Sequence, residues 1–304
     1  MSRARLLAAL AAAVALVVAS PGARADDAGA YYKQGMALKS QGKDDEAIAA
    51  FQKAVAADPK NGMAWASLGH LYKKKKDIPK AVDAYEKATA LITKDATLWA
   101  NLGMAYYRAD RPDDALVALG KACRLNPKDP EVQANLGTIK RQKGDVKGAI
   151  VHLELAVKYA PNDATFQNNL GVAYRTADRN EDAIKAFARA IEIAPNEADY
   201  HFNLAVVYRR QQEVEKAIPE YEKAVALTPD MAEAWYDLGH MYRLNHEDQK
   251  AIDAFNTYLE LNKGKDPEAQ KRAQDEIEAL GGKPAAQPAK KPAKPKGKGG
   301  KKDK

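Results

Sequence analysis

Residues 96–129 read ATLWANLGMAYYRADRPDDALVALGKACRLNPKD, and the same 34-residue pattern occurs seven times without a gap between Ala28 and Lys265. The eighth position is alanine in the sixth copy (Ala205) and glycine in the other six, namely Gly35, Gly69, Gly103, Gly137, Gly171 and Gly239. The twentieth position is alanine in every copy. A fixed period of this length predicts a solenoid, in which each unit contacts only its neighbours.

Apolar residues within a copy follow helical spacing. In the copy quoted above they include Trp99, Leu102 and Tyr106, and then Ala115 and Leu119. Spacings of three, four and seven residues indicate two amphipathic helices in each copy, called A and B here. Proline at position 32 is expected to end helix B, since it disfavours helical geometry in the preceding residue. It occurs in five copies, as Pro59, Pro127, Pro161, Pro195 and Pro229.

This pattern resembles the tetratricopeptide-repeat (TPR) family, whose signature is Trp-Leu-Gly-Tyr followed by Ala-Phe-Ala-Pro. The fifth copy matches it with Gln167, Leu170, Gly171, Tyr174, Ala183, Phe187, Ala190 and Pro195. The resemblance implies an all-α fold, a right-handed α-solenoid or superhelix of seven helix-turn-helix repeats at 28–61, 62–95, 96–129, 130–163, 164–197, 198–231 and 232–265. The fourth copy departs from the signature, because Gln133 and Lys140 stand where aromatic residues are usual.

A capping helix is predicted after the last repeat, over residues 266–282. Asp266 can cap its N-terminus, Pro267 suits the first helical position, and Gly281 can end it. Its narrow apolar stripe comprises Ala269, Ala273, Ile277 and Leu280. A polar outer face on a terminal element keeps a solenoid soluble.

The N-terminus has the pattern of a secretory signal peptide over residues 1–25. Arg3 and Arg5 precede an uncharged run from Leu6 to Val18, and Ala23-Arg24-Ala25 suits a cleavage site. We therefore expect an exported protein, in the bacterial periplasm or secreted. Cys123 is the single cysteine and is interpreted as a small buried apolar residue.

The net charge of +7 is unevenly distributed along the chain. The signal contributes three arginines, and residues 283–304 contribute nine lysines and one aspartate, which leaves −4 for the repeats and cap. This tail contains no residue that could build a core, so disorder is expected. Its lysines, namely Lys290, Lys291, Lys294, Lys296, Lys298, Lys301 and Lys302, suit anionic lipid, lipopolysaccharide or wall polymer. A solubilising spacer is an equally open interpretation, and sequence-specific nucleic-acid binding is not expected without aromatic residues.

Two columns of polar residues recur on the solvent-facing side of helix A. Position 6 is asparagine in four consecutive copies, at Asn101, Asn135, Asn169 and Asn203. Position 12 is arginine in four, at Arg141, Arg175, Arg209 and Arg243. The asparagines are similar to the ladder in the TPR superhelix of the O-linked N-acetylglucosamine transferase family, which implies a concave groove for an extended peptide. The arginines favour an acidic ligand or, alternatively, pair with acidic residues of helix B.

No pattern for catalysis is present. The five histidines are scattered, no metal-ligand spacing occurs, and there is no phosphate loop or nucleophile elbow. We therefore expect no enzyme activity, cofactor or metal, and no transmembrane span in the mature chain. The leading hypothesis is an exported TPR scaffold that binds an extended protein segment during assembly of an envelope complex. The alternative is a polyanion-binding envelope protein that acts through its tail, with the repeats as spacer or self-association surface. A third option is a subunit that presents substrate to a catalytic partner.

Overall fold

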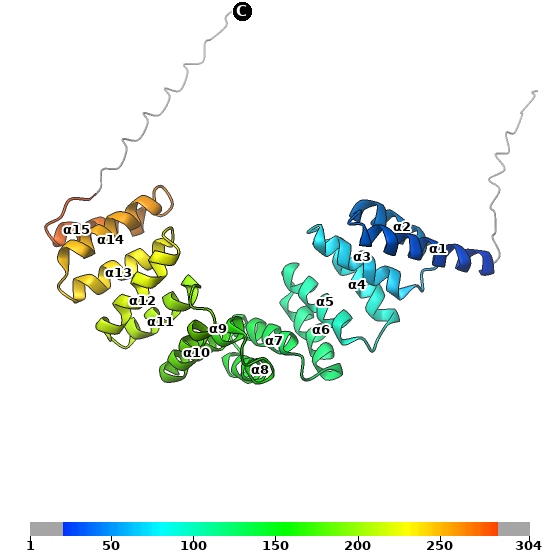
Figure 1. The fold of residues 1–304 in the computed structure, drawn as a ribbon, viewed down its shortest axis with the longest axis horizontal. Coiled ribbons are helices and arrows are strands. Elements are labelled where there is room, and N and C mark those ends of the chain that lie inside the picture. Colours follow the sequence, from blue (N-terminus) through cyan, green and yellow to red (C-terminus); the bar gives the residue numbers. More distant parts are fainter. Residues whose placement is uncertain (1–20, 285–304) are drawn as a thin grey trace, which may run out of the picture. The chain divides into compact units, whose positions relative to one another are not determined.

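The computed structural model describes residues 21–284, and their side chains from residue 27 onward. Fifteen α-helices fill this range (Figure 1). They are α1 (Pro21–Ser40), α2 (Asp44–Ala57), α3 (Gly62–Lys74), α4 (Ile78–Leu91), α5 (Ala96–Arg108), α6 (Pro112–Leu125), α7 (Pro130–Gln142), α8 (Val146–Tyr159), α9 (Ala164–Thr176), α10 (Asn180–Ile193), α11 (Ala198–Arg210), α12 (Val214–Leu227), α13 (Ala232–Leu244), α14 (Asp248–Leu261) and α15 (Pro267–Ala279).

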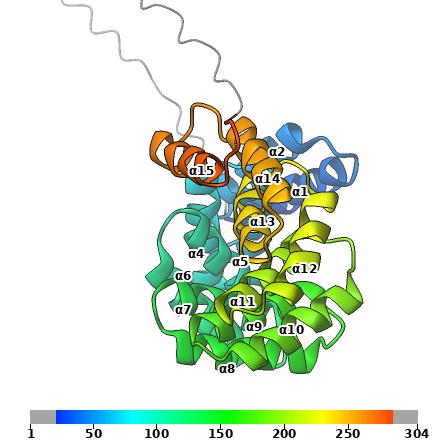
Figure 2. The same ribbon diagram turned by 90° about the vertical axis from the view of Figure 1, so that its left-hand side faces the viewer.

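The helices form two units that are described separately. The N-terminal unit holds α1 to α8 and the C-terminal unit holds α9 to α15, with the division after Tyr159. Within each unit the two helices of a pair contact each other most extensively, and each pair contacts the next. In the C-terminal unit α15 packs on α14 (Figure 2). The predicted all-α solenoid of paired helices is thereby confirmed.

The chain ends lie outside this description. Residues 1–20 and 285–304 are not described, so most of the predicted signal peptide and of the lysine-rich tail falls beyond the structure. Helix α1 begins at Pro21, ahead of the first repeat at Ala28. Among the described residues no helix is both long enough and apolar enough to cross a membrane.

In six repeats the core is built where helix B meets the glycine of helix A, and in the sixth copy Ala205 takes the place of that glycine. Phe187 of α10 is fully buried, and a Cβ added to Gly171 of α9 would lie 2.6 Å from its ring. Tyr85, Leu119, Leu153, Tyr221 and Phe255 are the corresponding buried residues of other repeats. Glycine therefore recurs at position 8 because the backbone of helix A directly contacts a large side chain.

The turn between helices A and B has the same backbone conformation in every repeat. Its fifteenth position has a positive φ in all seven copies: Gly42, Lys76, Asp110, Gly144, Asp178, Gln212 and His246. Only two of these are glycine, although a left-handed conformation costs other residues roughly 1–2 kcal/mol. The repeated turn thus depends on helix packing more than on local preference.

Helix B ends at the same position with or without proline. Helix α4 ends at Leu91 although its repeat has Thr93 at position 32, just as α6 ends at Leu125 before Pro127. The next helix begins with a side-chain cap at position 34: Asp95 accepts a hydrogen bond from the Leu98 amide at 2.9 Å. This cap fixes the start of the next helix, so proline at position 32 is not required to end helix B.

The contacts of position 4 of helix A explain the departure at Gln133. In six repeats its side chain donates an N–H to the backbone carbonyl six residues earlier. The pairs are Trp65 with Pro59, Trp99 with Thr93, Gln133 with Pro127, Gln167 with Pro161, His201 with Pro195, and Trp235 with Pro229, at 2.7–3.3 Å. The position therefore selects an N–H donor, which tryptophan, glutamine and histidine all supply.

Replacing Gln133 with leucine should lower the free energy of unfolding by roughly 1–3 kcal/mol, because the Pro127 carbonyl loses its partner. His152, whose Nδ1 lies 2.7 Å from the Gln133 Oε1, would lose its partner as well. Urea unfolding followed by circular dichroism measures the change. Gln133→Trp keeps an N–H donor and should be the more stable variant; equal stabilities would contradict the assignment.

Candidate functional site

The structure places the eight predicted groove residues on helices A, within two units. Asn101, Asn135 and Arg141 lie on α5 and α7 of the N-terminal unit. The other five lie on α9, α11 and α13 of the C-terminal unit: Asn169, Asn203, Arg175, Arg209 and Arg243. The four asparagines are half-buried, not fully exposed, and so are Arg141 and Arg175. Neighbouring side chains explain this burial at Asn101 and Asn203.

Position 12 of one repeat contacts position 6 of the next. Lys73 Nζ donates to Asn101 Oδ1 at 2.9 Å, and Arg175 donates to Asn203 Oδ1 at 3.0 Å. Arg209 lies 3.4 Å from a carboxylate oxygen of Asp237. The two predicted columns therefore contact each other. These basic residues pair with residues of the next helix A, and not with the helix B carboxylates considered above as an alternative.

This pairing continues to the cap. Arg243 has no following repeat, and it lies 3.4 Å from Glu276 of α15. Glu276 thus pairs with Arg243 as Asp237 pairs with Arg209. The sequence contained a usable signal for the three pairs between repeats, because their residues are 28 positions apart and combine a base with asparagine or a carboxylate.

A tyrosine from helix B completes one of these pairs. The buried Tyr221 hydroxyl of α12 donates to Asp237 at 3.0 Å and accepts from Arg209 Nε at 3.2 Å. Burial, and secondly the charge of Asp237, raise the pKa of Tyr221. The hydroxyl therefore stays protonated, and the charges of Arg209 and Asp237 neutralise each other beside it.

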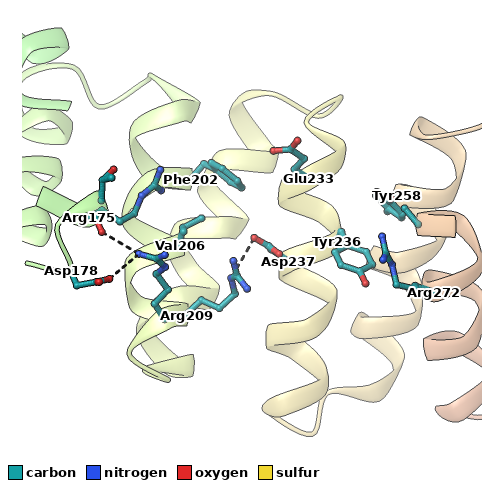
Figure 3. Close-up of a pocket in the computed structure, with 13 residues that line it drawn as sticks. Arg175, Asp178, Phe202, Val206, Arg209, Glu233, Tyr236, Asp237, Tyr258 and Arg272 are labelled. Atoms are coloured by element: carbon teal, nitrogen blue, oxygen red, sulfur yellow. Dashed lines mark hydrogen bonds and ion pairs between the residues drawn. The ribbon is translucent and has the colours of Figure 1, made fainter. Parts of the chain in front are cut away.

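A pocket of about 730 Å³ lies beside this triad in the C-terminal unit (Figure 3). Helices α9, α11 and α13 supply most of its lining, and α14 and α15 close it with Tyr258, Ala269 and Arg272. Apolar side chains from consecutive repeats, Phe202 and Tyr236, line it together with Val206. The sequence pattern predicts the helix A face but not the contribution of the capping helix α15 to this pocket.

The charges around the pocket are mostly paired with one another. Arg210 donates to the Arg175 carbonyl at 3.2 Å and lies 3.7 Å from Asp178, while Arg209 pairs with Asp237 (Figure 3). Among residues 27–284, Arg272 and Glu233 have no hydrogen-bonded or ion-pair partner. An aromatic-lined pocket with one free cation and one free carboxylate suits a polypeptide segment that carries both apolar and charged groups.

His201, His240 and Cys123 have structural contacts. His201 bridges Pro195 and Glu220, and His240 lies between the rings of Tyr236 and Phe255. Cys123 is half-buried, and its sulfur lies 3.4 Å from Gln133 Nε2. Within the described part of the chain no group of three histidine, cysteine or acidic residues could hold a metal ion.

Comparisons with known proteins agree with the fold of paired helices. Residues 2–234 match the family described as Cilia and flagella-associated protein 70 C-terminal domain, and residues 202–269 match the family described as Tetratricopeptide repeat. No curated protein matches.

Solved structures of repeat proteins are similar to the chain. YrrB, described as a TPR protein with an unusual peptide-binding site, is 25% identical with a TM-score of 0.54, over 60% of this chain and 95% of that one. MamA is 28% identical with a TM-score of 0.51, over 54% of this chain and 96% of that one. A TPR protein from Cytophaga hutchinsonii, 18% identical, shares the fold alone, with a TM-score of 0.64 over 79% of this chain and 98% of that one.

Proposed function

Because the chain belongs to the tetratricopeptide-repeat family, within the group described as Cilia and flagella-associated protein 70 C-terminal domain, we propose that it is a non-catalytic scaffold. It binds an extended segment of a partner protein against its helices A. The observation that carries this proposal is the pocket formed by α9, α11, α13 and α15. The similar YrrB, with its unusual peptide-binding site, supports it.

The chemistry of the pocket suits an extended chain. Phe202 and Tyr236 occupy the same position in consecutive repeats, so they offer two apolar contacts at a regular interval. Aromatic side chains in a partly enclosed pocket commonly dominate the binding energy of a peptide. Asn203 offers less than the sequence suggests, because its Nδ2 already donates to Asn168 at 3.0 Å. The aromatic pair, assisted by Arg272, therefore carries more of the proposed binding than the asparagines.

The proposed setting is the bacterial envelope, and assembly of an envelope complex is the proposed process. Its support is the pattern of residues 1–25, with two arginines, an uncharged run and a small-residue cleavage site. The alternative, polyanion binding through residues 283–304, concerns residues almost all outside the described part of the chain. Deleting this tail while leaving α15 intact tests that alternative: loss of all partner binding would favour it.

Crosslinking in the native source tests the scaffold proposal. A Phe202→Ala, Tyr236→Ala double variant should lose the partner proteins that the unchanged chain captures, whereas Lys185→Ala, on the exposed side of α10, should keep them. The Asn101, Asn135, Asn169 and Asn203→Ala variant shows what the asparagines add. A folded aromatic double variant that still captures the same partners would refute the proposal.

A further inference from the structure

The triad of Arg209, Tyr221 and Asp237 has a counterpart in the N-terminal unit that lacks the negative charge. Four repeats earlier the corresponding residues are Lys73, Tyr85 and Asn101. Lys73 donates to Asn101 at 2.9 Å, as expected for this pairing. The Tyr85 hydroxyl, on a residue that is 1% exposed, has no hydrogen-bond partner, whereas Tyr221 has two.

The surroundings of this incomplete triad are cationic. Within residues 27–284, Lys39, Lys73 and Arg108 have no carboxylate partner, while the nearby Lys74 is paired with Asp44 at 2.6 Å. Burial, followed by the charges of Lys39, Lys73 and Lys74, lowers the pKa of His70, although Asp44 opposes this effect. Burial and the charge of Arg108 likewise lower the pKa of Lys73. These groups act on one another as neighbouring like charges.

The helix A faces of the two units differ in charge. At positions 2, 5, 6, 9, 12 and 13, the four repeats of the N-terminal unit carry six bases and one acid: Lys33, Lys39, Lys73, Lys74, Arg108, Arg141 and Glu131. The three repeats of the C-terminal unit carry four bases and three acids: Arg175, Arg209, Arg210, Arg243, Asp199, Glu233 and Asp237. The excess positive charge therefore lies on the N-terminal unit, where the electrostatic attraction for an incoming anion is strongest.

We propose that the surface formed by Lys39, Lys73, Asn101 and Arg108, called the cationic cluster here, binds a carboxylate of an acidic protein segment. The ligand carboxylate would supply the charge that Asp237 supplies in the C-terminal unit. This proposal rests on the proposed scaffold function and adds the chemistry of a second contact region.

A polypeptide suits this surface better than a free anion. Met36 and Met63 are exposed on the same helix A faces, by 42% and 55%, and Met104 follows on α5. Flexible methionine side chains adapt to the apolar groups of a bound segment, which a small anion does not have. Charge complementarity and this apolar surface together identify the ligand as an acidic segment with interspersed apolar residues.

Asn101→Asp tests the proposal without removing a base. The new carboxylate would copy Asp237, pair with Lys73 and give the Tyr85 hydroxyl an acceptor, so it occupies the position proposed for the ligand. A hexaglutamate peptide should then bind the cluster at least about tenfold more weakly than it binds the unchanged chain. The midpoint of thermal unfolding should rise at the same time, because a buried hydroxyl gains a partner.

The measurement must separate the cluster from the lysine-rich tail, which also attracts an acidic peptide. Nuclear magnetic resonance of the histidine rings does so in the full chain, since His70 lies beside the cluster and His246 lies in the other unit. Hexaglutamate should shift the His70 signals and raise its pKa, and leave His246 unchanged. Asn196→Asp adds the same charge to an exposed turn. In this control the hexaglutamate affinity measured at His70 should stay within about twofold of that of the unchanged chain.

Three results would overturn the proposal. They are an unchanged His70 signal at saturating peptide, an equal response in Asn101→Asp and the unchanged chain, and tighter binding at His70 by inorganic phosphate or a single-stranded oligonucleotide than by the peptide. The scaffold function is judged separately, through Phe202→Ala in the C-terminal pocket. If hexaglutamate does not act on His70 but Phe202→Ala still weakens partner binding, the cationic cluster is refuted and the proposal for the C-terminal pocket is unaffected.

Discussion

Replacing Phe187 with alanine is expected to destabilise the C-terminal unit by about 3–5 kcal/mol. The ring is fully buried and packs against the backbone of α9 at Gly171. Backbone atoms of a packed helix cannot move in to fill the space that the ring leaves, so most of the cavity should persist. Urea unfolding followed by helix circular dichroism and by the fluorescence of Trp235, which lies in the same unit, measures the loss.

An exposed valine provides the control for this experiment. Val117 is 63% exposed on α6, and Val117→Ala should change the free energy of unfolding by less than about 0.5 kcal/mol. The reciprocal change, Gly171→Ala, places a Cβ 2.6 Å from the Phe187 ring and should cost roughly 1–3 kcal/mol through overpacking. A Phe187→Ala loss below about 1 kcal/mol would show that the repeats do not pack as described.

Ile277→Asp should detach the capping helix and weaken peptide binding at the pocket by about tenfold or more. Ile277 is fully buried on α15, and an unpaired carboxylate at this position is strongly disfavoured. Once α15 leaves, the pocket loses Ala269 and Arg272 from its wall. Loss of helical circular dichroism and of peptide affinity should therefore occur together, at a temperature where the remaining repeats stay folded.

A conservative variant shows whether this effect comes from the cap itself. Ile277→Val keeps an apolar contact and should cost only about 0.5–1.5 kcal/mol, with peptide affinity retained. Glu278→Ala, on the exposed side of the same helix, should change neither quantity. Full peptide affinity in Ile277→Asp, despite loss of α15, would show that the cap does not contribute to the site.

The helix pairs could be predicted from the sequence, because every repeat has the same kinds of residue at its packing positions. Glycine at position 8 opposite a large residue at position 24, as in Gly171 and Phe187, requires close helices, and seven copies remove the ambiguity of one. The start of the capping helix could be predicted in the same way. Asp266 accepts hydrogen bonds from the amides of Glu268 and Ala269 at the start of α15. Local rules of this kind depend only on neighbours in the chain.

Features that depend on side-chain length and direction were harder to predict. Gln133 stood out as a missing aromatic residue, yet it supplies the same N–H as Trp99 through a flexible amide. The pairing of Arg175 with Asn203 is not evident from either column alone, because it depends on an arginine side chain long enough to reach the next helix A. The positive φ of non-glycine residues such as Asp178 could not be predicted, because the left-handed conformation is locally unfavourable for them.

Whole-chain composition also concealed the contrast between the two units. Residues 27–159 hold 22 basic and 16 acidic residues, a net charge of +6. Residues 160–284 hold 15 basic and 23 acidic residues, a net charge of −8. The net charge of residues 27–284 is therefore only −2, a near-cancellation of two opposite units, and only the division seen in the structure makes the N-terminal positive charge relevant to binding.

Titration of a peptide selected for binding to the full chain, with heat as the readout, tests the pocket most directly. The unchanged chain should bind the peptide, and the Phe202→Ala, Tyr236→Ala double variant should bind it about tenfold more weakly or worse, with unchanged helix content. Equal affinities in the two proteins, or a loss of affinity in Val117→Ala instead, would contradict the assignment of this face.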